Sequence, residues 1–290
     1  MTVDRLATLL QHFSVSARMF HSGPLCGIND FAPEQGLGQL HLVQQGPLRI
    51  EHLQQAAIDV ARPSLLFYPR PMHHRFISDA REGATMACAH LQFGDGGDNP
   101  LVQSLPAFVV MPLDELDGLQ PVLDLLFREA FGAHCGRQVV VDRLFEVVLV
   151  HIIRRLMQQG AVEEGLLAGM AHPQLARSLV ALHAQPALAW SVETLAREAG
   201  MSRSVYAASF RRVLGTTPAD YLAAWRLSLT QQQLRQGKPL KQISDSVGYG
   251  SVATLSRAFK ARWGMSPREW KQAGSGGASG GTANEVAGSP

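Results

Sequence analysis

The sequence predicts an α+β protein of two domains: an antiparallel β-barrel or sandwich with added helices, followed by an all-α domain. Three observations support this. The chain has 290 residues, more than one hydrophobic core usually supports. Short apolar runs separated by turn residues fill residues 38–112, whereas helical periodicity follows from residue 119. In addition, one helical unit occurs twice between residues 192 and 270.

The strand-like runs are short and evenly spaced, as in a small antiparallel sheet structure. They read QLHLVQ, LRIEHL, PSLLFYP, TMACAHLQF and AFVVMP. Two helices are predicted next, DLLFREAF and VVVDRLFEVVLVHIIRRLMQQ, separated by GAHCGRQ.

The second of these helices carries two apolar stripes. One stripe comprises Val141, Leu144, Val148 and Ile152, and the other Phe145, Leu149, Ile153 and Leu156. We therefore expect one face to meet the sheet and the other a second subunit; the alternative is burial within its own domain.

Composition sets the expected domain boundaries. Residues 1–160 form the first domain, 161–172 a linker that follows Gly160, and 173–272 the second domain. Residues 273–290 are rich in Gly and Ser and are predicted to be disordered.

The net charge of +2 hides two opposite halves. Residues 173–272 hold 14 Lys and Arg against 5 Asp and Glu, whereas residues 1–172 hold 12 against 18. A basic domain joined to an acidic one indicates a polyanion-binding module beside a domain that avoids polyanions. Solvated charge with a chance asymmetry is the alternative.

Three cysteines are too few for a disulfide framework, which favours a reducing cytoplasm. The first twenty residues lack the long apolar core of a signal peptide. Charged residues interrupt the apolar stretch 139–157, so we expect no membrane span.

The repeated unit is defined by matching offsets. Val192, Leu195, Ala199 and Gly200 correspond to Leu240, Ile243, Val247 and Gly248; Tyr206 and Phe210 correspond to Leu255 and Phe259. Gly215, Pro218 and Tyr221 correspond in the same way to Gly264, Pro267 and Trp270.

Each unit reads as helix, tight turn and helix. Gly200 or Gly248 supplies the turn, and Ser202 or Ser251 can cap the second helix. This is the helix-turn-helix arrangement, whose second helix enters the major groove of DNA. A connecting helix of roughly 25–30 Å could set two such helices into successive grooves.

Residues 173–272 resemble the DNA-binding domain of AraC/XylS-type transcriptional regulators. The second motif of that family typically reads I-x-x-x-V-G-Y-x-S-x-x-x-F-x-R-x-F-K-x-x-x-G-x-x-P-x-x-[YWF], and here it stands as ISDSVGYGSVATLSRAFKARWGMSPREW. Leu255 replaces the usual Phe, and the first reading helix is poor in long polar side chains.

Residues 1–160 resemble the cupin-like sensor domain of a branch of the same family. The resemblance rests on PSLLFYPRPMHHRF, the strand around Cys88 and the N-P-L-x-x-x-L-P stretch at 99–106. It implies a cupin-like β-barrel for the first domain.

Outward residues near the start of each second helix should meet base edges, and the resemblance points to the same positions. They are Arg203, Ser204, Ala207 and Ala208 in the first unit, and Val252, Ala253, Ser256 and Arg257 in the second. Arg203 and Arg257 can contact guanine with two hydrogen bonds, worth about 1–3 kcal/mol of discrimination; a phosphate contact is the alternative for Arg257. Arg211, Arg212, Lys260 and Arg262 are expected to contact phosphate or to face solvent.

The sensor candidates are two histidines and two cysteines. His41, His73 and His74 suggest a metal, but the pattern of catalytic cupins is absent, and at most one of the adjacent His73 and His74 can face inward. We therefore expect no metal or cofactor. His41 and His73 are taken as sensor candidates. Cys26 and Cys88 could form an oxidant-sensing pair if their Cα atoms came within about 7 Å; two small buried residues are the alternative.

Together these features predict a sequence-specific transcriptional regulator, not an enzyme. Its partners would be double-stranded operator DNA, a small-molecule or oxidant effector and, in a homodimer, a second copy. The resemblance implies RNA polymerase as a further partner and activation as the direction of control. A cupin-type metalloenzyme with an accessory nucleic-acid module is the alternative, although no paired carboxylates or phosphate loop support it.

Overall fold

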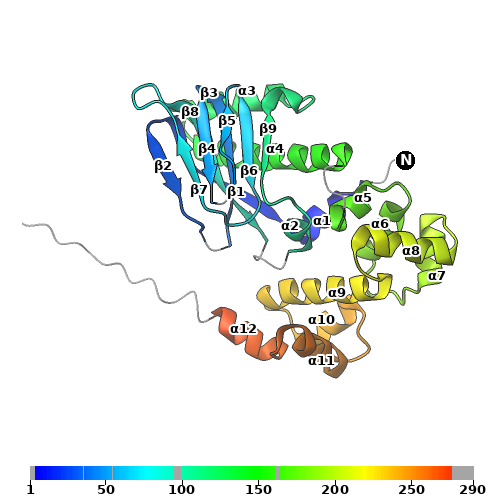
Figure 1. Ribbon diagram of the computed structural model, residues 1–290. Helices are drawn as coiled ribbons and strands as arrows, with labels where there is room; N and C mark the ends of the chain where they lie inside the picture. Colours follow the sequence, from blue (N-terminus) through cyan, green and yellow to red (C-terminus); the bar gives the residue numbers. More distant parts are fainter. Residues whose placement is uncertain (1–3, 35, 54, 95–98, 161–163, 276–290) are drawn as a thin grey trace, which may run out of the picture. The chain divides into compact units, whose positions relative to one another are not determined.

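The computed structural model describes residues 4–34, 36–53, 55–94, 99–160 and 164–275 (Figure 1). The strands are β1 (Val15–Leu25), β2 (Ile28–Phe31), β3 (Gly38–Gln45), β4 (Leu48–His52), β5 (Ile58–Val60), β6 (Ser64–Tyr68), β7 (His74–Ile77), β8 (Ala84–Phe93) and β9 (Val109–Pro112). The first helices are α1 (Ala7–His12), α2 (Pro100–Gln103), α3 (Gln120–Phe131), α4 (Arg137–Gln159) and α5 (Leu166–Ala171). The remaining helices are α6 (Leu175–Ala184), α7 (Val192–Ala199), α8 (Arg203–Leu214), α9 (Pro218–Arg235), α10 (Leu240–Val247), α11 (Val252–Trp263) and α12 (Pro267–Ser275).

Two antiparallel sheets form the β part. The larger sheet has the order β1-β8-β3-β6-β9 and the smaller sheet the order β2-β7-β4-β5. Their facing sides share one apolar core, which includes Val43, Leu66 and Met86 from the larger sheet and Ile50 and Phe76 from the smaller. The prediction of an antiparallel barrel or sandwich is confirmed.

Alternation along the strands of the larger sheet creates a second apolar layer. The residues that alternate along the strands with those of the inner core point to the other face of the sheet, and they are also fully buried. Examples are Leu40, Leu42, Leu65 and Phe67. Helices α3 and α4 lie along this outer face (Figure 1) and contact β1. The sheet is therefore covered on both sides, which explains why its central strands read as almost continuous apolar runs.

Helix α4 also covers the free edge of the sheet. Its side chain Asp142 accepts a hydrogen bond from the backbone N–H of Met19 at 2.7 Å, and Glu146 accepts one from Ala17 at 3.4 Å. Strand β1 is the edge strand, so these carboxylates occupy N–H groups that would otherwise be open to another chain.

Both apolar stripes predicted for α4 are largely buried within the chain. Seven of the eight residues are buried, and only Leu144 is half-exposed. The stripes thus follow the alternative of burial within the domain, and the expectation that one of them meets a second subunit is wrong. The apolar residues that α4 leaves exposed are Val139, Val140 and Val147.

The segment predicted to be a linker contains helix α5. Leu166, Leu167 and Met170 are buried, and the N–H of Gly165 donates to the carbonyl of Val213 in α8 at 2.8 Å. Helix α5 contacts both α4 and α8. This short helix therefore packs between the long helix of the β domain and the first helix-turn-helix.

The chain divides into two compact units. The first comprises Met1–Ala181 and Val192–Pro218, and the second Leu182–Ser191 and Ala219–Pro290. The first unit contains the sheets together with α7 and α8; the second contains most of α9 and all of α10 and α11.

The end of the chain differs slightly from the expectation. Helix α12 extends to Ser275, so residues 273–275, which were predicted to belong to the disordered tail, have helical backbone. The rest of the predicted tail, 276–290, lies outside the described residues. No helix in the described part of the chain is long and apolar enough to cross a membrane.

Candidate DNA interface and sensor cavity

The first helix-turn-helix consists of α7 and α8. Gly200 ends α7 with a φ of +66°, and the N–H of Met201 donates back to the carbonyl of Ala196 at 2.9 Å. Tyr206, Phe210 and Leu214 form the buried side of α8. Burial raises the pKa of the Tyr206 phenol to about 12. The buried side fixes which residues of α8 face outward.

The second helix-turn-helix repeats this construction with α10 and α11. Gly248 ends α10 with a φ of +84°. Ser251 caps α11 by accepting the N–H of Thr254 at 3.1 Å, and Leu255 and Phe259 are buried. The predicted cap at Ser202 of the first unit makes no such hydrogen bond.

A capping box starts the helix that follows the second unit. The N–H of Ser266 donates to Glu269 at 2.7 Å, and the N–H of Glu269 donates to the hydroxyl of Ser266 at 3.3 Å. The hydrogen bonds of Ser266 hold the pKa of the Glu269 carboxyl below its usual value.

The residues predicted to contact DNA bases lie on the uncovered sides of α8 and α11. Arg203, Ser204, Ala208, Ala253 and Arg257 are exposed, whereas Ala207, Val252 and Ser256 are half-exposed. The four residues predicted to contact phosphate, Arg211, Arg212, Lys260 and Arg262, are all exposed. Their accessibility fits the predicted role, and their contacts with DNA stay a prediction.

Arg203 has a partner that the sequence did not suggest. Its Nε lies 2.8 Å from Oε1 of Glu193, which is in the first turn of α7. In the second unit the corresponding positions hold Lys241 and Val252, so the pair has no counterpart there. The two reading helices thus present different charge patterns.

Buried polar side chains lie between the two sheets. Nε2 of His41 on β3 is 3.2 Å from Nε2 of His74 on β7, and Nδ1 of His74 is 2.9 Å from the carbonyl of Met72. A carbonyl only accepts, so Nδ1 of a neutral His74 carries the proton and its Nε2 accepts from His41. Burial lowers the pKa of His74 to about 4 and that of His41 well below its ordinary value.

Of the two adjacent histidines, His74 faces inward, and the sensor candidate His73 does not. His73 is half-exposed and lies 3.8 Å from Asp30, whereas His74 is buried with its ring stacked on Tyr68 at 4.0 Å. The hydroxyl of Tyr68 is in turn 2.9 Å from Nε2 of His52. His52 was missed because its strand, LRIEHL, offered no signal beyond alternation. In the described part of the chain, no three His, Cys, Asp or Glu side chains are grouped to hold a metal ion.

The two sensor cysteines are far apart. Leu25 pairs with Ala84 at one end of the β1–β8 ladder, whereas Cys88 pairs with His21 near its middle, so Cys26 lies just beyond that end and away from Cys88. Cys26 adjoins Gly83, five residues from Cys88, which corresponds to roughly 16 Å along a strand. The condition for a direct disulfide is therefore not met. Cys88 is fully buried and its thiol pKa is raised by burial, whereas Cys26 is exposed.

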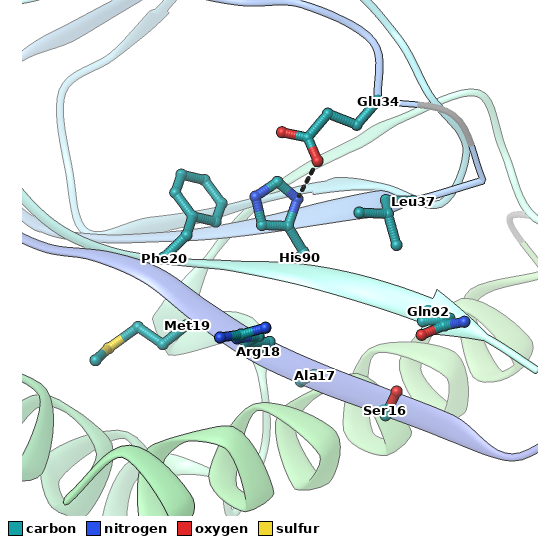
Figure 2. Close-up of a pocket in the computed structure, with 9 residues that line it drawn as sticks. All are labelled: Ser16, Ala17, Arg18, Met19, Phe20, Glu34, Leu37, His90 and Gln92. Atoms are coloured by element: carbon teal, nitrogen blue, oxygen red, sulfur yellow. Dashed lines mark ion pairs between the residues drawn. The ribbon is translucent and has the colours of Figure 1, made fainter. Parts of the chain in front are cut away.

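A cavity of about 500 Å³ opens where β1, β8 and the segment before β3 meet (Figure 2). It is lined by Ser16, Ala17, Arg18, Met19, Phe20, Glu34, Leu37, His90 and Gln92. The rings of Phe20 and His90 are adjacent, with centroids 4.2 Å apart, and Glu34 reaches His90 from the opposite side (Figure 2). Its volume is in the range of small-molecule sites. These residues were missed because they come from three separate segments, 16–20, 34–37 and 90–92.

Comparisons with known proteins agree with both halves of this description. A family model described as a cupin matches residues 4–158, more than half of the chain, and one described as a helix-turn-helix domain matches residues 195–273.

A putative AraC-like transcription regulator of Streptomyces antibioticus is 38% identical over 176 residues, which are 59% of this chain and 58% of that protein. The chain thus spans less than two thirds of the length of this relative. The RCS-specific HTH-type transcriptional activator RclR of Escherichia coli K12 is 27% identical over 84% of this chain and 89% of its own length. The DNA-binding domain of AdpA, solved in complex with a target DNA, is 27% identical with a TM-score of 0.34, over 38% of this chain and 98% of that one. The chain belongs to the AraC-type family of transcription regulators, with an N-terminal cupin domain and a C-terminal helix-turn-helix domain.

Proposed function

We propose that the protein is a sequence-specific DNA-binding transcriptional regulator in which α8 and α11 read adjacent major grooves. The observation that carries the proposal is the duplicated helix-turn-helix. Its second helices each expose an arginine, Arg203 at the start of α8 and Arg257 within α11. The excess of Lys and Arg in residues 173–272 supplies the electrostatic attraction that DNA binding needs.

Selection of bound fragments from genomic DNA by the purified full-length protein tests this proposal. We expect enrichment of sites with two half-sites about one helical turn apart, one for each reading helix. Retention of all fragments equally at 150 mM salt would contradict sequence-specific binding. The genes beside the enriched sites would identify the regulated pathway.

Arg257 is the residue on which base reading by α11 depends most in this proposal. Replacing Arg257 by Ala should weaken binding to the selected site more than tenfold, measured by fluorescence anisotropy, with an unchanged far-UV CD spectrum. Arg257→Lys separates the two roles, because Lys keeps the charge for a phosphate contact but not the planar, two-bond geometry. Wild-type affinity in Arg257→Lys would assign Arg257 to phosphate.

The direction of regulation and the remaining partners are part of the proposal. The name of the E. coli relative, a transcriptional activator, supports activation, and the family resemblance supports contact with RNA polymerase. We place the protein in the cytoplasm, where the DNA is. For a homodimer, the exposed Val139, Val140 and Val147 of α4 provide an apolar surface, and analytical ultracentrifugation would measure the association.

The cupin domain is proposed to sense a small molecule. The cavity at its edge and the buried histidines between its sheets support this role. The enzymatic alternative predicts stoichiometric metal and turnover in the purified protein. Metal analysis and turnover assays would distinguish the two.

A further inference from the structure

The cavity of the cupin domain carries two opposite charges that do not pair with each other. Apart from its backbone pairing with β8, Arg18 on β1 has no ion pair or hydrogen bond from its guanidinium to any of the described residues. The Glu34 carboxylate has one described partner, Nδ1 of His90 at 3.7 Å, which is too long for a hydrogen bond. The cavity therefore offers a guanidinium for an anionic group and a carboxylate for a cationic group.

Strand register brings these charges to the same place. Arg18 is directly opposite His90 in the β1–β8 pairing, so their side chains are neighbours on one face of the sheet. Glu34 approaches the same imidazole from the other side of the cavity (Figure 2). Both charged residues thus line the same cavity as His90.

The inner face next to the cavity has an excess of hydrogen-bond acceptors. Gln39 lies opposite His90 on β3, is 7% exposed, and its Oε1 has no described partner. Nδ1 of His41, two residues further along the same face, is also without a described partner, and the proton assignment above makes it an acceptor. Neither residue lines the cavity, so these acceptors belong to the polar interior between the sheets beside it.

An aromatic wall completes the cavity. Phe20 lies beside His90, and its ring is 6.2 Å from that of Phe31 and 6.1 Å from that of His41. Leu37 lies across from these rings (Figure 2). A flat apolar group would bury its surface here.

We propose that this cavity binds an α-amino acid with an aromatic side chain. The carboxylate pairs with Arg18, the ammonium donates to Glu34, and the ring lies against Phe20. A ligand with only one of the two charges would leave either Arg18 or Glu34 unpaired. The assignment of this amino acid as the effector rests on the proposed regulatory function; the binding itself does not.

Three probes that share one phenyl group test the assignment by calorimetry on the full-length protein. L-phenylalanine carries both charges, 3-phenylpropionate only the carboxylate, and phenethylamine only the ammonium. We expect L-phenylalanine to bind at least tenfold more tightly than either of the others. Equal affinity for L-phenylalanine and either single-charge probe, or no heat with any of the three, would overturn the proposal.

Two charge-removing variants assign the contacts. Arg18→Gln should weaken L-phenylalanine binding at least tenfold and leave phenethylamine binding unchanged. Glu34→Gln should weaken L-phenylalanine equally and leave 3-phenylpropionate unchanged. Arg62→Gln and Glu115→Gln are matched controls, because these two residues pair with each other at 3.4 Å outside the cavity. Loss of binding in the controls as well would overturn the assignment.

The wild-type protein is also tested with its selected DNA in the same preparation. A protein that binds DNA specifically but none of the probes disproves the amino-acid site alone. A protein that binds L-phenylalanine but no specific DNA disproves the regulatory function alone.

Discussion

At the scale of single residues, the ion pair between Arg203 and Glu193 distinguishes α8 from α11, which has no such pair. Both side chains are exposed, so the pair itself contributes little stability. Its effect is on orientation: a guanidinium held by a carboxylate loses less freedom when it binds a base edge. In the proposed complex with DNA, Glu193 would therefore position Arg203.

Replacing Glu193 by Gln tests this role. Two DNA sites are compared: the selected site, and the same site with the guanine that Arg203 contacts replaced by another base. We expect the ratio of the two affinities to fall a few-fold in Glu193→Gln, because Arg203 is less well oriented. Affinity for random DNA should rise slightly, since a negative charge near phosphate is removed. Competition binding measures both values. Glu198→Gln on the same helix is the control; the same loss of preference there would contradict a specific role for Glu193.

The buried His74 makes the stability of the cupin domain sensitive to acid. In the unfolded chain a histidine takes up a proton below its ordinary pKa of 6.5, whereas burial lowers the pKa of His74 to about 4 in the folded protein. The unfolded state therefore binds more protons between these values, and stability falls as the pH drops through this range. From pH 7 to pH 5 the loss should be about 2 kcal/mol from His74 alone.

Thermal unfolding at several pH values measures this effect. His74→Gln should flatten the pH dependence, although not abolish it, because the pKa of His41 is also lowered. His73→Gln, at the half-exposed neighbouring position, should change the slope much less, because the charge of His73 is only a minor cause of the lowered pKa of His74. An equally steep slope in His74→Gln would show that other groups cause the acid sensitivity.

At the scale of elements, the repeat could be predicted from the sequence because its signals are local. Turn glycines and caps specify the helix ends, and the four-residue spacing of Tyr206 and Phe210 specifies a buried face, all without long-range information. Strand β1 was missed, since VSARMFHSGPL contains Gly23 and Pro24 and is stabilised by β8 and by carboxylates of α4. Helix α5 was read as a linker because it is short and begins after Gly165, and its buried leucines gain stability only from tertiary packing.

The turns of the two repeats differ in a way that can be measured. A Cβ on Gly248 would lie 2.6 Å from the backbone Cα of Ala187, whereas one on Gly200 would have only the end of the Arg177 side chain nearby, at 3.6 Å. Gly200→Ala should thus cost about 1–2 kcal/mol, the strain of a left-handed conformation. Gly248→Ala should cost clearly more, because the backbone at Ala187 must also move.

Chemical denaturation of both variants gives the comparison, with Gly264→Ala as a control at another left-handed glycine that has nothing within 4 Å. Gly264→Ala should behave like Gly200→Ala. Equal losses in all three variants would mean that the segment around Ala187 does not pack on the second turn.

At the scale of the whole molecule, the two-domain organisation could be predicted from the sequence, but the cavity of the cupin domain could not. The opposite net charges of the two halves and the repeat can be recognised in the sequence alone. The cavity cannot, because Arg18, Glu34 and His90 come from segments that only sheet register brings together. Which of His73 and His74 faces inward could not be predicted for a related reason: alternation says that one of them does, and only the pairing of β7 says which.

Helix α5 offers a physical route between the cupin domain and the first reading helix, because it contacts both α4 and α8. Gly169 is at its centre. A Cβ there would lie 2.8 Å from Cδ1 of Leu179 and 2.8 Å from Cδ2 of Leu214, the last residue of α8. Gly169→Val should therefore force these side chains apart and cost about 1–3 kcal/mol.

Hydrogen exchange followed by mass spectrometry would show how far this change extends. We expect faster exchange in α5 and at the end of α8, together with weaker binding to the selected DNA, because the reading helix loses its support. Ala168→Val places the same side chain at a half-exposed position of α5 and should leave α8 protected. A contrary result would be lower protection in α5 and α4 with wild-type protection of α8 and wild-type DNA affinity. Helix α5 would then have a packing role alone, and any coupling between sensing and DNA binding would need another path.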